Sequence, residues 1–180
     1  MKKLASQLLS KLPKLQNLPV IKNIPESIKQ TAVIRFFGLR EIPLIFFVAP
    51  TVKALTDETC VIQIPLNRRT KNHLGSMYLG TMCIGADLAG GLNAIKLADE
   101  AGFKMSLAFK ELNAQFLKRP EGDTFFTCND GLKVKALIET LKTSHERHNL
   151  PVHITATCPS TSGDTPVAEF TLVLPLKRIS

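Results

Sequence analysis

One carboxylate, Asp87, lies among small and apolar residues in segment 67–91. If residues 77–98 are helical, Asp87 shares a stripe of small residues with Gly80, Cys83, Gly91 and Ala94. A carboxylate on a buried helix is unfavourable unless it is paired, hydrogen-bonded or functional. With no cation nearby in sequence, its pKa should be raised, and it can serve as a general base or nucleophile. A capped or salt-bridged structural Asp is the alternative.

The helix expected at residues 77–98 should be buried on most of its circumference. Beside the small stripe runs a second stripe, which consists of Met77, Thr81, Ile84, Leu88, Leu92 and Ile95. Each glycine inside a helix costs about 1 kcal/mol relative to alanine. We therefore expect a neighbouring element to approach the backbone of this helix closely.

The rest of the chain predicts strands and one further helix. Residues 43–51 and 60–66 are short and β-rich, and they are expected to pair across a turn. Residues 103–116 alternate in polarity, with a slip at Glu111 that indicates a β-bulge or a bend. Residues 124–128 should pair back with them as a hairpin strand. A second helix should begin at Asp130 and end near residue 149, before strands at 152–158 and 167–176. This order favours an α+β fold in which an antiparallel sheet wraps around one long central helix.

The chain divides into a basic amphipathic arm, residues 1–40, and a domain, residues 41–180. The arm holds eight Lys and Arg against one Glu, which accounts for +7 of the formal charge of +8. Its leucines share one helical face, and prolines break it into short amphipathic pieces. Either the arm packs on the domain as a strap, or it lies on an anionic membrane or a partner.

Several classes of protein are disfavoured. The domain is nearly neutral and has no aromatic–basic interleaving, so we expect no nucleic-acid partner. The four cysteines are widely spaced, without a C-x-x-C pair or a His at metal-ligand spacing. They predict free thiols, a reducing cytoplasm and no metal site. The apolar run at 42–50 is too short to span a membrane, and a signal peptide is not expected. The arm raises peripheral membrane contact as an alternative location.

Two motifs resemble the hotdog-fold acyl-CoA thioesterases, in particular the PaaI-like branch. That branch has an Asn, then His-Gly-Gly six residues later at the start of the central helix, and an Asp nine residues past the His. Here Asn72 is followed at the same spacing by Tyr78, Leu79 and Gly80, and Asp87 stands nine residues past Tyr78. The string F-L-K-R-P-E-G-D at residues 116–123 resembles a second family motif. The form N-H-L-G-S-x-Y-x-G…D is most similar to a poorly characterised bacterial subgroup.

The resemblance implies hydrolysis of an acyl-CoA or acyl-carrier thioester, with coenzyme A as part of the substrate and no other cofactor. The Leu79 and Gly80 amides would bind the developing oxyanion at the helix start. Asn72 would orient substrate or water, and Asp87 would be the base or nucleophile. About 13 Å of helix rise separates Tyr78 from Asp87. The family's arrangement, a homodimer or dimer of dimers in which each Asp faces its partner's helix start, is therefore expected.

Five further residues are candidates for substrate contact: His73, Tyr78, Arg68, Arg69 and Ser106. His73 lies near the helix start, and the two arginines belong to a basic cluster that could contact coenzyme A phosphates. Ser106, on the following strand, could assist a water. A loop histidine, a solvated basic loop and an ordinary strand serine are the alternatives.

Two positions depart from the family pattern, because Tyr78 and Leu79 stand where the family has His and Gly. The Leu79 amide remains available, since every residue except proline keeps its N–H. The space beside the Leu79 amide is smaller than in the family, because a leucine side chain replaces glycine. These departures favour a second hypothesis, a hotdog protein that binds an acyl group or lipid without turnover. A third is a membrane-surface or partner-binding module that acts through the arm.

Overall fold

The computed structural model describes residues 25–144 and 146–179. Residues 1–24 of the arm, which carry the predicted leucine face of Leu4, Leu8, Leu12 and Leu15, lie outside them. The described elements follow in the order α2 (Glu26–Glu41), α3 (Pro43–Val48), β1 (Thr51–Leu55), β2 (Cys60–Ile64), α4 (Leu79–Glu100), β3 (Met105–Leu107), β4 (Glu111–Phe116), β5 (Thr124–Cys128), α5 (Gly131–Leu141), β6 (His148–Thr157), α6 (Pro159–Ser162) and β7 (Pro166–Arg178).

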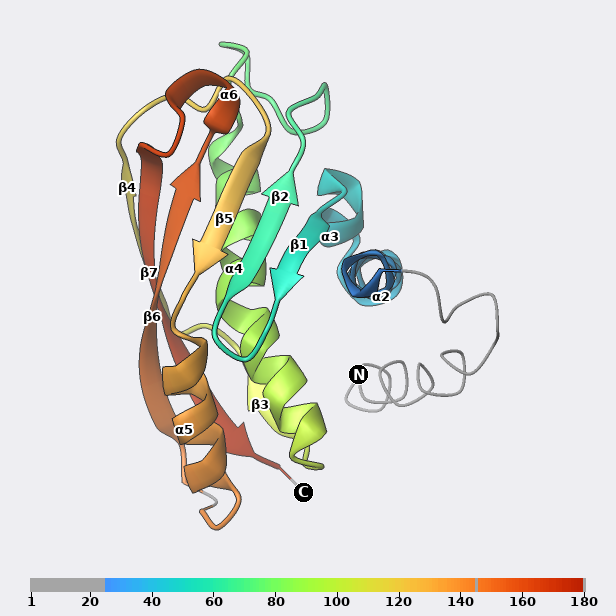
Figure 1. The fold of residues 1–180 in the computed structure, drawn as a ribbon, viewed down its shortest axis with the longest axis vertical. Helices are drawn as coiled ribbons and strands as arrows, with labels where there is room; N and C mark the ends of the chain where they lie inside the picture. Colours follow the sequence, from blue (N-terminus) through green and yellow to red (C-terminus); the bar gives the residue numbers. More distant parts are fainter. Residues whose placement is uncertain (1–24, 145, 180) are drawn as a thin grey trace.

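The strands form one antiparallel sheet that curls around α4 (Figure 1). Their order is β1-β2-β5-β6-β7-β3, and β4 also pairs with β7. β3 and β4 lie along the same edge of β7, because Met105 is opposite Arg178 and Phe116 is opposite Ala168. This is the predicted α+β hotdog fold, an antiparallel sheet around a long central helix.

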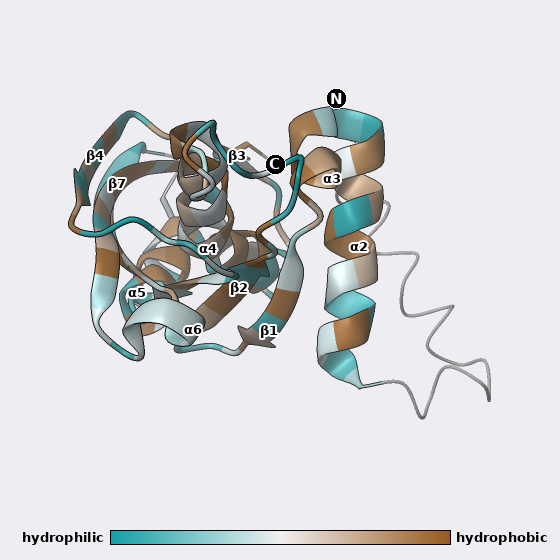
Figure 2. Cartoon of the chain, turned by 90° about the horizontal axis from the view of Figure 1, so that it is seen from above, coloured by the Kyte–Doolittle hydropathy of each residue, from teal (hydrophilic) through white to brown (hydrophobic). Residues whose placement is uncertain are grey.

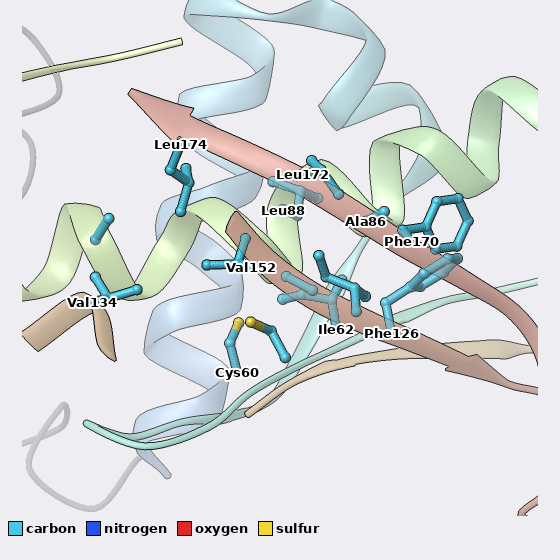
Figure 3. Packing of buried hydrophobic residues seen from close by; sticks show 14 of the residues in the cluster. Cys60, Ile62, Ala86, Leu88, Phe126, Val134, Val152, Phe170, Leu172 and Leu174 are labelled. Carbon is cyan, nitrogen blue, oxygen red and sulfur yellow. The ribbon is translucent and has the colours of Figure 1, made fainter. Parts of the chain in front are cut away.

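Small residues on α4 allow the sheet to approach its backbone. Gly85 lies against the ring of Phe126 on β5, so closely that a Cβ at Gly85 would be 2.4 Å from Cε2 of the ring. Figure 3 shows the neighbouring Ala86 beside Phe126 and Phe170. Dispersion contacts across this approach offset the low helix propensity of glycine. The expected close approach to a glycine-bearing helix is confirmed.

The side of α4 that packs most tightly differs from the predicted stripe. It runs through Met82, Ala86, Ala89 and Asn93, all of them buried. The predicted stripe keeps Thr81 and Leu88 buried, but Ile84, Leu92 and Ile95 are only partly buried. Two of the four residues on the buried side, Ala86 and Ala89, are small enough to lie directly in the tightly packed core, and both are 0% exposed.

The prediction of a strand at residues 43–51 is wrong. Residues Pro43–Val48 form helix α3, and strand β1 begins only at Thr51. Pro43 occupies the first turn of α3, where its missing N–H is not needed. Ala49 ends the helix in the left-handed region, at φ 52°. A short apolar run has no periodicity that separates strand from helix, which is why this segment was misassigned.

Two further boundaries need correction. β5 pairs with β2 and β6 and does not pair back with β4, so the predicted hairpin is wrong. The second helix ends at Leu141, and His148 already begins β6, so the predicted end near residue 149 is too late. The predicted irregularity at Glu111 is confirmed by the break between β3 and β4.

Helix α2 covers the outer edge of the sheet at β1. Thr31 Oγ1 accepts the Val52 N–H at 2.9 Å, and Arg35 donates to the Pro50 carbonyl at 2.9 Å and to the Ala49 carbonyl at 3.1 Å. In Figure 2, α2 and α3 stand outside the sheet, next to β1. The described part of the arm is therefore one continuous helix that protects edge backbone groups. The short pieces predicted between the prolines lie outside the described residues.

Candidate functional site at the start of helix α4

The loop that leads from β2 into α4, residues 65–78, is organised around a buried threonine. Thr70 Oγ1 donates to the Pro65 carbonyl at 2.6 Å and accepts the Asn67 N–H at 2.9 Å. The Thr70 carbonyl accepts the Tyr78 N–H at 2.8 Å. Because one residue satisfies both ends of the loop, the backbone just before α4 is held in a fixed position.

The two motifs noted in the sequence meet in space. Asp123 Oδ1 accepts the Leu66 N–H at 2.9 Å, and Asp123 Oδ2 accepts from Gln63 Nε2 at 2.7 Å. The Pro120 carbonyl accepts the Met77 N–H at 2.9 Å. The 116–123 string therefore anchors the loop that carries the first motif. Sequence reasoning quoted this string but did not predict its contacts, and it missed Thr70 entirely.

The start of α4 presents unpaired backbone donors. Tyr78 is the N-cap residue, and its side chain makes no capping hydrogen bond. Within residues 25–144 and 146–179, the N–H groups of Leu79 and Gly80 have no hydrogen-bond acceptor. The Leu79 side chain is 53% exposed, so this end of the helix is open to solvent. Such a terminus carries a partial positive charge that stabilises an anion or a developing oxyanion.

The aromatic ring of Tyr78 folds back over Gly80. A Cβ at Gly80 would be 2.7 Å from Cε1 of this ring, although Tyr78 as a whole is 55% exposed. The ring therefore borders the open donors and narrows the space beside them. A ligand that reaches the Gly80 amide has to pass the ring or displace it.

Asn72 shapes the turn before the helix. Its Nδ2 donates to Ser76 Oγ at 3.1 Å, and its Oδ1 accepts the Leu74 N–H at 2.9 Å. The side chain is thus committed to the turn in this structure. His73, in the same turn, is exposed.

The two predicted basic contacts lie earlier in the loop. Arg68 and Arg69 are both exposed. The Arg69 guanidinium lies over the ring of Phe47 on α3, 5.7 Å from its centroid. This cation–π contact joins the loop of the candidate site to the hairpin formed by α2 and α3.

Asp87 is half-buried in the middle of α4. Burial raises the pKa of its carboxyl from 3.8 to about 6, and no charged group contributes to the shift. Among the residues that the structure describes, Asp87 has neither an ion-pair nor a hydrogen-bond partner. The expectation of a raised pKa is confirmed, and a structural ion pair within the described chain is excluded. A carboxylate with this pKa is half-ionised near pH 6 and mostly ionised at neutral pH, which suits a general base.

One chain brings only part of the predicted set together. Asn72, Tyr78, Leu79 and Gly80 meet at the helix start, whereas Asp87 lies about 13 Å further along the helix axis. Ser106 is exposed on β3, where its neighbours Met105 and Leu107 pack against the core. Because strand side chains alternate, Ser106 points away from α4 in its own chain.

The four cysteines are free thiols. Cys83, on the small stripe of α4, is half-buried, and burial raises the pKa of its thiol. A raised pKa disfavours the thiolate, so Cys83 is a packing residue rather than a nucleophile. The described residues contain no group of three His, Cys, Asp or Glu that could hold a metal ion. They also contain no helix with the length and apolar character needed to cross a membrane.

The family model described as "Domain of unknown function (DUF4442)" matches residues 30–174. The chain belongs to this family. The match begins within α2 and ends within β7, so the DUF4442 region includes the edge-covering helix as well as the sheet and α4. No curated protein matches the chain significantly.

Solved structures share the fold of this DUF4442 protein at low sequence identity. A Pseudomonas aeruginosa protein described as a probable thioesterase is 21% identical, with a TM-score of 0.68 over 83% of this chain and 96% of that one. A Chlorobaculum tepidum protein of unknown function is 12% identical, with a TM-score of 0.71 over 85% and 97%. A Haemophilus influenzae thioesterase is 12% identical, with a TM-score of 0.58 over 79% and 88%. These likenesses establish the fold.

Proposed function

We propose that this protein is a thioesterase that hydrolyses an acyl-CoA or acyl-carrier thioester. The observation that carries the proposal is Asp87, an unpartnered carboxylate with a pKa raised to about 6 on the central helix of a hotdog fold. The open donors at Leu79 and Gly80 supply the second requirement, a site for the oxyanion. Two of the structural neighbours are described as thioesterases, which supports the same class of reaction.

In the proposed reaction, the thioester carbonyl oxygen accepts hydrogen bonds from the Leu79 and Gly80 amides. Asp87 takes a proton from a water as that water attacks the carbonyl carbon, and the negative charge collects on the oxyanion. The carbon–sulfur bond then breaks, the protonated Asp87 returns its proton to the departing thiolate, and a carboxylic acid and a free thiol are released. In a second version, Asp87 attacks the carbonyl carbon directly, the carbon–sulfur bond breaks and the thiolate leaves. Water then hydrolyses the resulting anhydride, which regenerates the Asp87 carboxylate; one proton of the water goes to the thiolate, and the other is released on the carboxylic acid.

This chemistry needs two copies of the chain, because Asp87 and its own helix start are about 13 Å apart. Strand β4 offers a surface for the second copy. Five of its six residues are exposed, including Leu112 at 42% and Phe116 at 47%. Its outer edge has no partner strand among the described residues. An unprotected apolar edge strand is a template for pairing, so we propose a homodimer, or a dimer of dimers, joined at β4.

The exposed residues of the loop would contact the coenzyme A portion of the substrate. Arg68 and Arg69 are both exposed and would meet phosphate groups, Arg69 from its position over Phe47. His73 is exposed in the turn before the helix start. Ser106 points away from α4 in its own chain. It would therefore contact only a substrate bound on the opposite side of the sheet from α4. The proposed reaction involves no further cofactor and no nucleic acid. The proposed location of the protein is the cytoplasm.

The test is a panel of acyl-CoA substrates with detection of the released thiol. We expect wild-type protein to release thiol with at least one acyl group, and Asp87→Asn to reduce kcat by about two orders of magnitude or more. Asp99→Asn is the matched control, because Asp99 is an exposed carboxylate on the same helix; its activity should equal that of the wild type. Equal rates for Asp87→Asn and wild type would exclude the proposed role of Asp87.

A second candidate function is acyl or lipid binding without turnover. The ring of Tyr78 over Gly80 favours it, because the ring obstructs the approach of a carbonyl group to the amide. In that case the panel yields no thiol, while the same acyl-CoA molecules bind in calorimetry. Tyr78→Ala would then increase affinity for the bulkier acyl groups.

A further inference from the structure

Helix α2 has its polar and apolar residues in an unusual arrangement. Thr31 and Arg35 face the sheet edge and bind its backbone. Ile28, Phe36 and Leu39 are instead exposed, at 56%, 45% and 56%. At 100° per residue these three fall within a sector of roughly 80°, so they line one side of the helix. A surface helix normally turns such a stripe toward the core. Figure 2 shows the hydrophobic bands along α2 outside the sheet.

Helix α3 extends this apolar character. Leu44 is 63% exposed and Phe47 is 48% exposed, while Ile45 and Val48 are buried against the domain. We call the exposed side chains of Ile28, Phe36, Leu39, Leu44 and Phe47 the hairpin surface. Large exposed apolar side chains concentrated on two adjacent helices indicate an interaction surface.

The two helices are held together rigidly. A Cβ at Gly38 of α2 would be 2.6 Å from the backbone nitrogen of Phe46 in α3, so only glycine permits this approach. Ile34 of α2 is also buried. This close packing places the residues of the hairpin surface on two adjoining helices.

The charges around the hairpin surface have a small basic excess, because helix α2 carries three cations and two carboxylates and Arg69 adds a fourth cation beside α3. Arg40 is exposed on α2, and the Arg69 guanidinium lies over Phe47. The two acidic residues of the hairpin each have a cation beside them: Glu26 is 3.4 Å from Lys29, and Glu41 is 3.8 Å from Arg40. Residues 1–24, which directly precede α2 in the chain, contain five lysines and no acidic residue.

From these observations we propose that the hairpin surface docks on an anionic lipid bilayer. Aliphatic and aromatic side chains would enter the interface between headgroups and acyl chains, and the neighbouring cations would bind anionic headgroups. The absence of a membrane-spanning helix among the described residues agrees with contact at the surface. A protein that bound the hairpin surface would need an apolar centre surrounded by a large acidic rim. An anionic bilayer offers an apolar interior and negative headgroups over its whole area.

The test is co-sedimentation of the full chain with vesicles of an equimolar mixture of phosphatidylcholine and phosphatidylglycerol. The double variant Phe36→Ser/Phe47→Ser should have an affinity for these vesicles that is lower than that of the wild type by about tenfold or more. Leu132→Ser is the matched control, because Leu132 is 57% exposed on α5, away from the hairpin; it should bind like the wild type. Vesicles of phosphatidylcholine alone should bind the wild type more weakly, and salt should weaken binding to the anionic vesicles.

Three results would overturn the proposal. Equal binding of the double variant and the wild type would assign any adsorption to another part of the chain. Equal binding to neutral and anionic vesicles would remove the role of the cations. Light scattering that shows a lower molar mass for the double variant in solution would assign the hairpin surface to a second copy of the chain. Because all three substituted side chains are exposed, both variants should fold like the wild type. Thermal unfolding of each variant checks this.

Discussion

The ring of Tyr78 occupies the space in which a side chain at Gly80 would lie, with Cε1 only 2.7 Å from the position of a Cβ. In this conformation the ring of the N-cap residue leaves room only for glycine at the second residue of α4. This relationship places an aromatic group beside the open amides of the helix start.

The stability effect of Gly80→Ala should depend on Tyr78. Alanine is favoured over glycine in a helix by up to about 1 kcal/mol. In the wild-type background, the added methyl group has to displace the ring, which offsets that gain. In a Tyr78→Ala background, the same substitution should stabilise the protein. Urea unfolding of the four proteins of this cycle should give a coupling free energy of about 0.5–1 kcal/mol. Additive effects would show that the ring does not restrict Gly80.

The buried carboxylate should make the protein less stable as pH rises. The pKa of Asp87 is about 6 in the folded protein against 3.8 as its ordinary value. The folded state therefore binds the proton more tightly, and the free energy of unfolding falls as pH rises between these two values. At pH values above this window, Asp87→Asn should be more stable than the wild type by about 1–2 kcal/mol, since partial exposure reduces the effect. Below the window the two should be equal. Unfolding curves at acidic and neutral pH measure both.

The same pKa predicts the pH profile of the proposed reaction. If ionised Asp87 is the base, kcat/KM should rise about tenfold per pH unit below about 6 and level off above it. The profile should be recorded with a substrate whose thioester is stable over this range. A rate that is flat between about pH 4 and about pH 6 would argue against ionised Asp87 as the base, since a rise of about tenfold per pH unit is expected there.

Substitution of Asp123 should lower both the free energy of unfolding and the substrate affinity of the candidate site. Its two oxygens bind the Leu66 N–H and Gln63 Nε2, and Pro120 in the same string binds the loop directly before Tyr78. Asp123→Ala leaves both donors without a partner and should destabilise the protein by about 1–3 kcal/mol. It should also raise KM, because the loop at the helix start loosens. Asp123→Asn keeps one acceptor and should lie between alanine and the wild type in both measurements.

Gly85 should tolerate no larger residue unless Phe126 shrinks. Gly85→Ala places a methyl group 2.4 Å from Cε2 of Phe126 and should cost about 1–3 kcal/mol. Combining it with Phe126→Leu should recover part of that loss. A Gly85→Ala protein as stable as the wild type would show that α4 can shift away from the sheet.

The sequence predicted the central helix and most strands because their apolar residues recur with clear periods. The family resemblance carried by the spacing from Asn72 to Asp87 likewise implied a helix start near Tyr78, and α4 begins at Leu79. The errors arose where local sequence is ambiguous. Segment 43–48 has no period that distinguishes a helical turn from a strand, and only tertiary packing selects α3. The pairing of β5 with β2 and β6 is set by long-range topology, which short-range turn signals do not encode.

The candidate site was less accessible to prediction than the fold. The raised pKa of Asp87 followed from its small, uncharged neighbours. The role of Thr70 did not, because a buried threonine that joins both ends of a loop has no local signature. The commitment of Asn72 to its own turn was equally hidden, since it depends on the backbone path between Asn72 and Ser76.

The cover that α2 provides over β1 limits how copies of this chain can associate. A sheet with two bare edges can add copies at both ends and grow into an open filament. Here one edge is closed by Thr31 and Arg35, and β4 lies at the opposite margin of the sheet. If two copies join at β4, each brings a covered edge to the outside, and the extended sheet ends there. Because the β1 edge is covered and the β4 edge is open, pairing at β4 gives a closed dimer and no further copies can add to the sheet.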